Sequence, residues 1–473
     1  MGSMAAPPPP PPCQCHLVCV PYPGRGHVNA MLNLCRLLAA ARDGVSATVV
    51  VTEEWLGLLT AGGPAPLPRA VRLAAIPNVI PSEHGRAADW AGFVEAVYTK
   101  MEAPFVRLLD GLQAQGGAPA AIVADTFVPW AVRVGNRRRI PVCVLSPLSA
   151  AMFSVQYHFH RLPQAAGGSA SPPLDGADIA DGVGPCLIEN YIPGLKSIRL
   201  ADLEPSHSNK AALNSILEAY VEVRKAQCVI FTSFYEIESD AIDSLRQELP
   251  CPVFSVGPCI PFMALQEHNA NTEKESYMAW LDAQPVNSVL YVSLGSFLSV
   301  SPAQLDEIAY GLAQSKVRFM WVLRDACSRV EGLIQGSDGM VVPWSDQLKV
   351  LCHPSVGGFL THCGMNSMLE ALYAGVPMLT LPIVLDQPIN SRLIVDVWKV
   401  GYSLKEKVRA DSVIGRDEIA EAVKKLMMNS GDAEGVRRRA SLLEEASRTT
   451  AEEGGSSYRD IMAFIDFISP SKR

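Results

Sequence analysis

The sequence has neither an excess of positive charge nor a long apolar run, and each shortage excludes a class of function. Its 473 residues contain 40 Lys and Arg against 48 Asp and Glu, a net charge of −8. Proteins that bind nucleic acid or anionic membranes usually carry a basic surface, so we expect neither partner here. No stretch of about 18 apolar residues occurs, so we expect no membrane span.

Signals for export and for disulfide bonding are also missing. The N-terminus holds Pro7–Pro12 in place of a basic segment and an apolar segment before a cleavage site, and we expect residues 1–12 to form a disordered tail. The 12 cysteines are scattered along a long chain, whereas disulfide frameworks belong to short secreted chains. We therefore expect buried free thiols in a cytoplasmic protein, and we expect that protein to be a monomer.

Apolar residues, in contrast, are abundant at 48%, and they follow two periodicities in the first half of the chain. Short apolar runs at Leu17–Val20, Ala47–Thr52, Ala121–Ala124 and Pro141–Leu145 are typical of buried strands. Between the first two, Met31, Leu34, Cys35 and Leu38 recur at helical spacing. This alternation predicts an α/β fold around a mostly parallel sheet.

The same alternation starts again at Ser288–Leu294, after a polar and irregular stretch. We therefore predict an N-terminal domain over 13–257, a linker over 258–276 and a C-terminal domain over 277–473. Its last helix is expected to pack back on the first domain. The Gly-, Ser- and Pro-rich segment Pro163–Pro185 predicts a long loop within the first domain.

The turn Pro21–His27 joins the first predicted strand to its helix. Ligands of parallel sheets bind beyond the carboxyl ends of the strands, so this turn faces a crevice. Gly24 and Gly26 suggest a dinucleotide site, but Asn29 occupies the third glycine position and weakens that interpretation. His27 is placed to act as a general base, or it simply occupies the first turn of the helix.

Asp125 ends another predicted strand of the same half. A carboxylate there can hold one imidazole nitrogen and stabilise the imidazolium that forms on proton transfer. The alternative is that Asp125 caps a helix beginning near Phe127. The sequence contains no Gly-x-Ser-x-Gly nucleophile motif and no Cys/His set at zinc spacing, so we expect no serine nucleophile and no metal site.

The segment from Trp344 to Gln387 carries the most specific signal. It resembles, at full length, the signature of the plant family 1 UDP-dependent glycosyltransferases, the secondary-product glycosyltransferases. His27 in Pro-Gly-Arg-Gly-His, Asp125 in Ala-Asp-Thr-Phe and Ser296 in Val-Ser-Leu-Gly-Ser extend the resemblance over both halves. The matching signature positions are Trp344, Gln347, His353, Phe359, His362, Cys363, Gly364, Asn366, Ser367, Glu370, Gly375, Pro377, Pro382, Asp386 and Gln387.

The resemblance implies two facing Rossmann-like domains of the GT-B type with a cleft between them. It implies a UDP-sugar as co-substrate and no cofactor. The residues support it independently, because a helix that opens at His362 after a strand offers free N–H groups to a diphosphate. The competing interpretation is a helix capped by its own polar residues.

The resemblance also implies a role for each matched residue. Trp344 would stack on uracil, Gln347 would lie at the nucleoside end, and Glu370 would accept the ribose hydroxyls. Asp386 and Gln387 would bind the sugar, and a terminal Gln is associated with glucose. The remaining residues assigned to the donor, mostly around its diphosphate, are Ser296, Ser345, His362, Gly364, Asn366 and Ser367.

The predicted reaction is an inverting transfer of a sugar, expected to be glucose, to a hydroxyl or carboxyl of a small lipophilic acceptor. His27 would remove the acceptor proton, and Asp125 would hold His27. We expect the acceptor pocket to come from Ile80–Trp90, Ser146–His160 and Pro163–Pro185. Two alternatives remain: a non-catalytic small-molecule receptor on a transferase fold, and a nucleotide-cofactor oxidoreductase.

Overall fold

In a computed structural model of the chain, the structure describes residues 15–61, 67–86, 89–162, 187–203, 210–265, 276–295, 300–323, 327–404, 413–428 and 431–469. The predicted tail over 1–12, the predicted loop Pro163–Pro185 and Ser296 lie outside the described residues, as does most of the predicted linker. Among the helices of the described part, none is both long and apolar enough to cross a membrane.

The N-terminal lobe is built on a seven-stranded parallel sheet in the order β3-β2-β1-β4-β5-β6-β7. β1 lies inside the sheet, and its side chains alternate between two cores: Val18 and Val20 pack on one face, Leu17 and Cys19 on the other. A strand buried on both faces reads as a continuous apolar run, as this one does. The strands are β1 (Cys15–Val20), β2 (Val45–Thr52), β3 (Val71–Ile76), β4 (Ala121–Asp125), β5 (Val142–Ser146), β6 (Cys228–Phe231) and β7 (Val253–Ser255).

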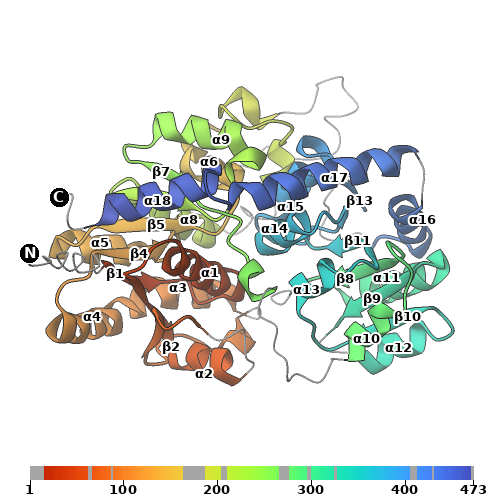
Figure 1. The fold of residues 1–473 in the computed structure, drawn as a ribbon, viewed down its shortest axis with the longest axis horizontal. Helices are drawn as coiled ribbons and strands as arrows, with labels where there is room; N and C mark the ends of the chain where they lie inside the picture. Colours follow the sequence, from red (N-terminus) through yellow and green to blue (C-terminus); the bar gives the residue numbers. More distant parts are fainter. Residues whose placement is uncertain are drawn as a thin grey trace, which may run out of the picture.

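Helices cover both faces of this sheet (Figure 1). In α1 the residues Met31, Leu34, Cys35 and Leu38 are all buried, which confirms the predicted apolar face. The helices of this lobe are α1 (Arg25–Ala41), α2 (Glu53–Ala61), α3 (Trp90–Lys100), α4 (Glu102–Gly116), α5 (Pro129–Arg138), α6 (Ala150–Tyr157), α8 (Lys210–Val223) and α9 (Tyr235–Glu248).

The C-terminal lobe repeats the design with a six-stranded parallel sheet in the order β10-β9-β8-β11-β12-β13. Its strands are β8 (Val289–Ser293), β9 (Arg318–Val322), β10 (Gly339–Val342), β11 (Val356–Thr361), β12 (Met378–Thr380) and β13 (Gly401–Ser403). Its helical segments are α10 (Ser276–Asp282), α11 (Pro302–Ser315), α12 (Cys327–Leu333), α13 (Gln347–Leu351), α14 (Met365–Tyr373), α15 (Gln387–Arg392), the π-helix η7 (Leu393–Val397) and α16 (Arg416–Met427).

In each sheet the strands are added in one direction up to a single point, after which the chain returns and adds strands in the other direction. In the first sheet that point lies between β1 and β4, and in the second between β8 and β11. The loops that leave the two strands at such a switch point diverge and open a crevice beyond their carboxyl ends. The topology therefore places the turns after these four strands at the candidate site.

The last two helices join the lobes. α17 (Gly431–Thr450) runs along the C-terminal lobe, and α18 (Ser456–Ile468) crosses to the N-terminal lobe (Figure 1). On α18, Phe464 contacts the ring of Phe254 at 5.7 Å, and Asp460 accepts a hydrogen bond from the Ser255 amide at 2.7 Å. Apolar side chains of α18 belong to the same core as those of α1 and β1. The chain terminus thus holds the first lobe against the second.

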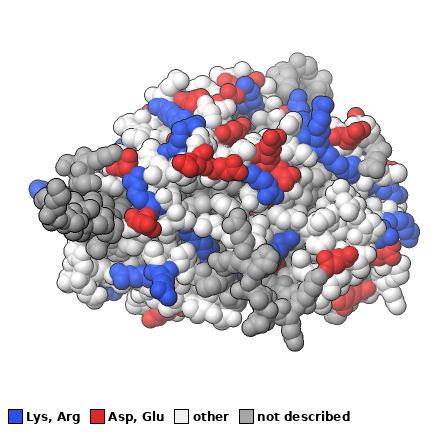
Figure 2. Space-filling model, in the orientation of Figure 1, with Lys and Arg blue, Asp and Glu red and all other residues white. Residues whose placement is uncertain are grey.

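The surface carries both signs of charge. On the face shown in Figure 2, acidic and basic side chains intermix and no extended area of one sign stands out.

Candidate active site between the lobes

His27 and Asp125 meet at the switch point of the first sheet. His27 lies in the first turn of α1, and Asp125 is the last residue of β4. The His27 Nδ1 lies 2.8 Å from the Asp125 Oδ2; the His27 side chain is 22% exposed and that of Asp125 is fully buried. Because a carboxylate can only accept, His27 Nδ1 carries the proton and Nε2 is left as the basic nitrogen.

The second oxygen of Asp125 serves the local backbone. Oδ1 accepts a hydrogen bond from the Phe127 amide at 3.0 Å. The expected helix begins later than the sequence suggested: α5 starts at Pro129, and its cap residue Val128 makes no side-chain cap bond. Asp125 therefore orients His27 and closes a turn, and it does not cap α5.

Aromatic rings surround His27. The Tyr22 ring lies 5.0 Å and the Phe127 ring 5.8 Å from the imidazole, and Phe93 of α3 contacts Tyr22 at 6.0 Å. Tyr22 is buried, its hydroxyl has no hydrogen-bond partner among the described residues, and burial raises its pKa. Arg86, from the segment Ile80–Trp90 expected at the acceptor site, donates to the Pro23 carbonyl at 3.2 Å. Tyr22 and Phe93 are buried, so the partly exposed Phe127 ring is the one of the three that offers an apolar surface beside the basic nitrogen.

The second lobe faces this pair with the start of α14. Gly364 is its cap residue and makes no side-chain cap bond, so the first-turn N–H groups are not closed off by a side chain. The preceding Cys363 has φ of +68°, which turns the chain sharply from β11 into the helix. Unsatisfied N–H groups and the positive end of the helix dipole together favour an anion.

His362 lies beneath this turn. A Cβ on Gly295 or on Gly364 would come within 2.6 Å of its Nε2, so glycine is required at both positions. Burial lowers the pKa of His362 to about 4, against a hydrogen bond to the Ser293 backbone that raises it. At neutral pH the imidazole is therefore uncharged, its single N–H is used by the Ser293 backbone, and it does not act on a phosphate as a cation.

Three polar residues expected to bind the donor are in contact with one another. Gln347 Nε2 donates to Glu370 Oε2 at 2.6 Å and to Ser367 Oγ at 3.0 Å. Trp344 is 52% exposed, so its ring is open to a ligand. Ser345 is also expected at the donor, and its buried hydroxyl shares a hydrogen bond with the Tyr291 hydroxyl at 3.0 Å. The structure therefore gives Ser345 a partner in the core.

Burial raises the pKa of Glu370 to about 7, although the bond from Gln347 opposes the shift. A carboxylate accepts two ribose hydroxyls, whereas a carboxylic acid must donate its own proton. We therefore expect the UDP Kd to rise by roughly tenfold when the pH falls from 8 to 6, as Glu370 becomes protonated. Calorimetry with Glu370→Gln supplies the control, because ionisation of UDP affects both proteins alike. A wild-type slope equal to that of the variant would contradict the prediction.

Asp386 and Gln387 follow β12, after Leu385 at φ of +61°. Burial raises the pKa of Asp386, while a hydrogen bond from Asn390 and the charge of His27 across the cleft act in the opposite direction. Gln387 Oε1 accepts from the amides of Ile383 at 2.8 Å and Val384 at 3.1 Å. Two backbone donors fix the oxygen inward, so only the amide nitrogen of Gln387 is left for a ligand.

The two lobes touch at the centre of the site. Asn366 Nδ2 donates to the Gly26 carbonyl at 2.9 Å, which joins the first turn of α14 to the turn before His27. His27 Nε2 of the N-terminal lobe and the first-turn N–H groups of α14 in the C-terminal lobe therefore border the same space. The sequence reasoning missed Asn390 and Ser149, two buried residues that connect the lobes behind it. The helical i,i+4 spacing of Asn390 from Asp386 is the one signal that pointed there.

Comparison with known proteins agrees with this geometry. The family model described as UDP-glucoronosyl and UDP-glucosyl transferase matches residues 214–445. UDP-glycosyltransferase 87A2 of Arabidopsis thaliana is 44% identical over 458 residues, 96% of this chain and 97% of that protein. The indole-3-acetate beta-glucosyltransferase of Zea mays is 30% identical over 484 residues, 96% of this chain and 98% of that protein.

Solved structures share the architecture. UGT71G1 of Medicago truncatula, crystallised with UDP-glucose, superposes with a TM-score of 0.81 at 26% identity over 96% of this chain and 98% of that one. UGT2 of Phytolacca americana, in complex with UDP-2fluoro-glucose and pterostilbene, gives 0.78 at 25% identity over 96% and 100%. These likenesses confirm the predicted GT-B fold and leave the receptor and oxidoreductase alternatives without support. The chain belongs to the plant family 1 UDP-glycosyltransferases, and it is an enzyme of that family.

Proposed function

We propose that this enzyme transfers glucose from UDP-glucose, with inversion, to a hydroxyl or carboxyl of a small lipophilic acceptor. The supporting observation is the 2.8 Å contact between His27 and Asp125 on one lobe, opposite the uncapped start of α14 on the other. His27 Nε2 takes the acceptor proton while the acceptor oxygen bonds the anomeric carbon. The bond from that carbon to the diphosphate oxygen breaks at the same time, and UDP departs toward α14.

Inversion follows from where the two groups lie. The base belongs to the N-terminal lobe and the diphosphate site to the C-terminal lobe, so attack and departure occur on opposite faces of the sugar. N–H groups already aimed at the departing diphosphate stabilise the charge that develops there. The chemistry is complete with the UDP-sugar alone, so we propose that no cofactor or metal takes part. The described part of the chain holds no group of three His, Cys, Asp or Glu residues suited to a metal.

The acceptor class rests on the rings around His27 and on what the relatives act on. By name, relatives at 30% identity glucosylate indole-3-acetate in Zea mays and 7-deoxyloganetin in Catharanthus roseus. A structural neighbour binds pterostilbene. All three are small molecules with a hydroxyl or carboxyl on a largely apolar frame, which suits an apolar ring such as that of Phe127 beside a base. Free thiols at Cys143, Cys228, Cys259 and Cys363, among others, fit the proposed cytoplasmic location.

Incubation with isotopically labelled UDP-glucose and a panel of phenols, terpenoid alcohols and aromatic acids tests the proposal. Mass spectrometry should show an acceptor carrying one labelled glucose, and NMR should show a β-linkage from the α-linked donor. An α-linked product would overturn inversion. Transfer from another UDP-sugar but not from UDP-glucose would overturn the donor assignment, and no product with any lipophilic acceptor would overturn the acceptor class.

Trp344→Ala should raise the UDP Kd by about ten- to a hundredfold, the usual range for losing one base-stacking side chain. The residue is 52% exposed, so the melting temperature should stay unchanged. Trp344→Phe keeps an aromatic face and should recover most of the affinity. Calorimetric titration with UDP measures both variants. An alanine variant that binds UDP as the wild type does would remove Trp344 from the uracil site.

A further inference from the structure

Asn390 is a fully buried residue of α15 whose side-chain amide is bonded on all sides. Its Nδ2 donates to Asp386 Oδ2 at 2.7 Å and to the Cys363 carbonyl at 2.9 Å, and its Oδ1 accepts from Ser149 Oγ at 3.1 Å. The two acceptors require the nitrogen and the hydroxyl donor requires the oxygen, so the orientation of the amide is determined by its partners.

The two acceptors bound by Asn390 belong to different parts of the donor site. Asp386 is the carboxylate assigned to the sugar. Cys363 is the left-handed residue that turns β11 into α14, and this turn presents the N–H groups for the diphosphate. One side chain therefore fixes the sugar carboxylate relative to the diphosphate turn.

The third partner comes from the opposite lobe. Ser149 caps α6, where its Oγ accepts from the Met152 amide at 3.2 Å. The same helix start is held by Glu238, whose Oε1 accepts from the Ala151 amide at 3.2 Å. Glu238 lies inside α9 at a point of non-helical backbone, with φ of −136° and ψ of 24°. The hydroxyl that reaches Asn390 is thus held rigidly within the N-terminal lobe.

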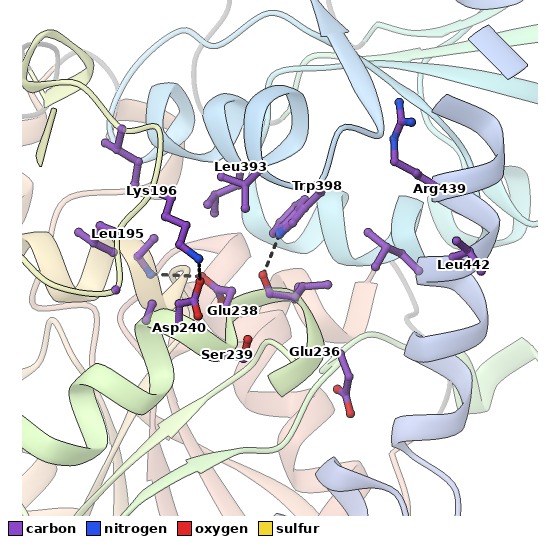
Figure 3. Close-up of a pocket in the computed structure, with 17 residues that line it drawn as sticks. Leu195, Lys196, Glu236, Glu238, Ser239, Asp240, Leu393, Trp398, Arg439 and Leu442 are labelled. Carbon is purple, nitrogen blue, oxygen red and sulfur yellow. Dashed lines mark hydrogen bonds and ion pairs between the residues drawn. The ribbon is translucent and has the colours of Figure 1, made fainter. Parts of the chain in front are cut away.

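Other contacts between the two lobes, here called the seam, surround the contact of Ser149 with Asn390. A hollow of about 350 Å³ is lined by residues of α9, η7 and α17, among others. Figure 3 shows Glu238 and Trp398 among these lining residues. Trp398 Nε1 donates across the seam to the Ile237 carbonyl at 2.8 Å. Nearby, Arg392 Nε contacts both carboxylate oxygens of Asp202 at 3.1 Å. The lobes therefore have several contacts, and the one through Ser149 reaches Asp386 and the Cys363 turn by way of Asn390.

We propose that Asn390 is a positioning residue for sugar transfer, which holds Asp386 and the Cys363 turn in place while Ser149 of the opposite lobe engages its amide. The inference rests on the proposed function, because it takes Asp386 as the sugar-binding carboxylate. If the lobes part, water replaces Ser149 at Oδ1, and the side chain loses the contact that confines it. Docking of the N-terminal lobe on the C-terminal lobe thereby completes the site for the donor sugar.

The test compares UDP-glucose with UDP, because only the former has a sugar for Asp386 to bind. Asn390→Ala should raise the calorimetric Kd of UDP-glucose by about ten- to a hundredfold, the range for lost hydrogen bonds to a charged group. The Kd of UDP should change far less. Ser149→Ala should shift the same ratio in the same direction, and Ser149→Thr, which keeps the hydroxyl, should restore it. Asp202→Asn removes a different lobe contact and should leave the ratio unchanged.

Failure of the inference and failure of the sugar assignment give different results. If Asp386→Asn leaves the UDP-glucose to UDP ratio unchanged, the sugar role of Asp386 is wrong. If Asp386→Asn changes the ratio but Asn390→Ala and Ser149→Ala do not, the positioning role is wrong. Equal shifts in Ser149→Ala and Asp202→Asn would also overturn it, because they would show a general effect of lobe docking. The serine pair decides the question even if Asn390→Ala does not fold.

Discussion

His27→Ala should lower kcat for transfer to a hydroxyl acceptor by about 10²- to 10⁴-fold, the range that a positioned general base contributes. His27 Nε2 is the basic nitrogen left at the acceptor face once Nδ1 is bonded to Asp125. The Kd for UDP should stay within about twofold, because the nucleotide groups belong to the opposite lobe and lose none of their donors. Initial rates by chromatography and UDP titration by calorimetry measure the two quantities.

The acceptor decides how large this loss is. An aromatic acid is already ionised at neutral pH, since its carboxyl pKa lies near 4, and its oxygen needs no base. His27→Ala should therefore cost much less with a carboxylic acid acceptor than with a phenol or an alcohol. Hydroxyl transfer that survives the substitution within tenfold would show that another group takes the proton.

The strands that the sequence revealed are those with two buried faces. β1, β4, β5, β8 and β11 lie inside their sheets and read as apolar runs. The three strands that the periodicity did not reveal, β3, β10 and β13, are all edge strands. β3 has only its first and last residues buried, and β13 has three residues. These three strands are incompletely covered, so their composition resembles that of a loop, whereas the edge strand β7 is buried at all three of its residues.

The residues of the candidate site also fall into those that the local sequence indicates and those that it does not. His27, Asp125 and His362 follow strands at the two switch points, where a local motif and the fold together determine position. Asn390 and Ser149 depend on how one lobe docks on the other, and no spacing along the chain encodes a contact between residues 241 positions apart. Neighbours along the chain can also point in different directions. Trp344 is exposed, whereas the hydroxyl of the adjacent Ser345 points inward to Tyr291. Sequence alone predicted the contact between His27 and Asp125, but it did not predict the contact between Ser149 and Asn390.

Asp125→Asn should lower kcat by roughly 10³- to 10⁴-fold, comparable with the loss known for the equivalent change in a serine protease. The reason lies in the two bonds of the carboxylate. Oδ1 accepts from the Phe127 amide, a backbone donor that cannot reverse. An asparagine must give its single oxygen to that amide, so its NH₂ group faces His27 Nδ1. His27 then accepts at Nδ1 and carries its proton on Nε2, where no proton can be taken from the acceptor.

Asp125→Ala separates this tautomer effect from simple loss of a partner. With alanine, His27 has no neighbour to dictate its tautomer, and a fraction of the molecules keep Nε2 unprotonated. The alanine variant should therefore be at least as active as the asparagine variant, although asparagine is the closer match in shape. Transfer rates and the ¹⁵N shifts of the His27 ring measure both consequences. Higher activity with asparagine than with alanine would mean that Asp125 acts by holding the ring in place, and that the tautomer is set by something else.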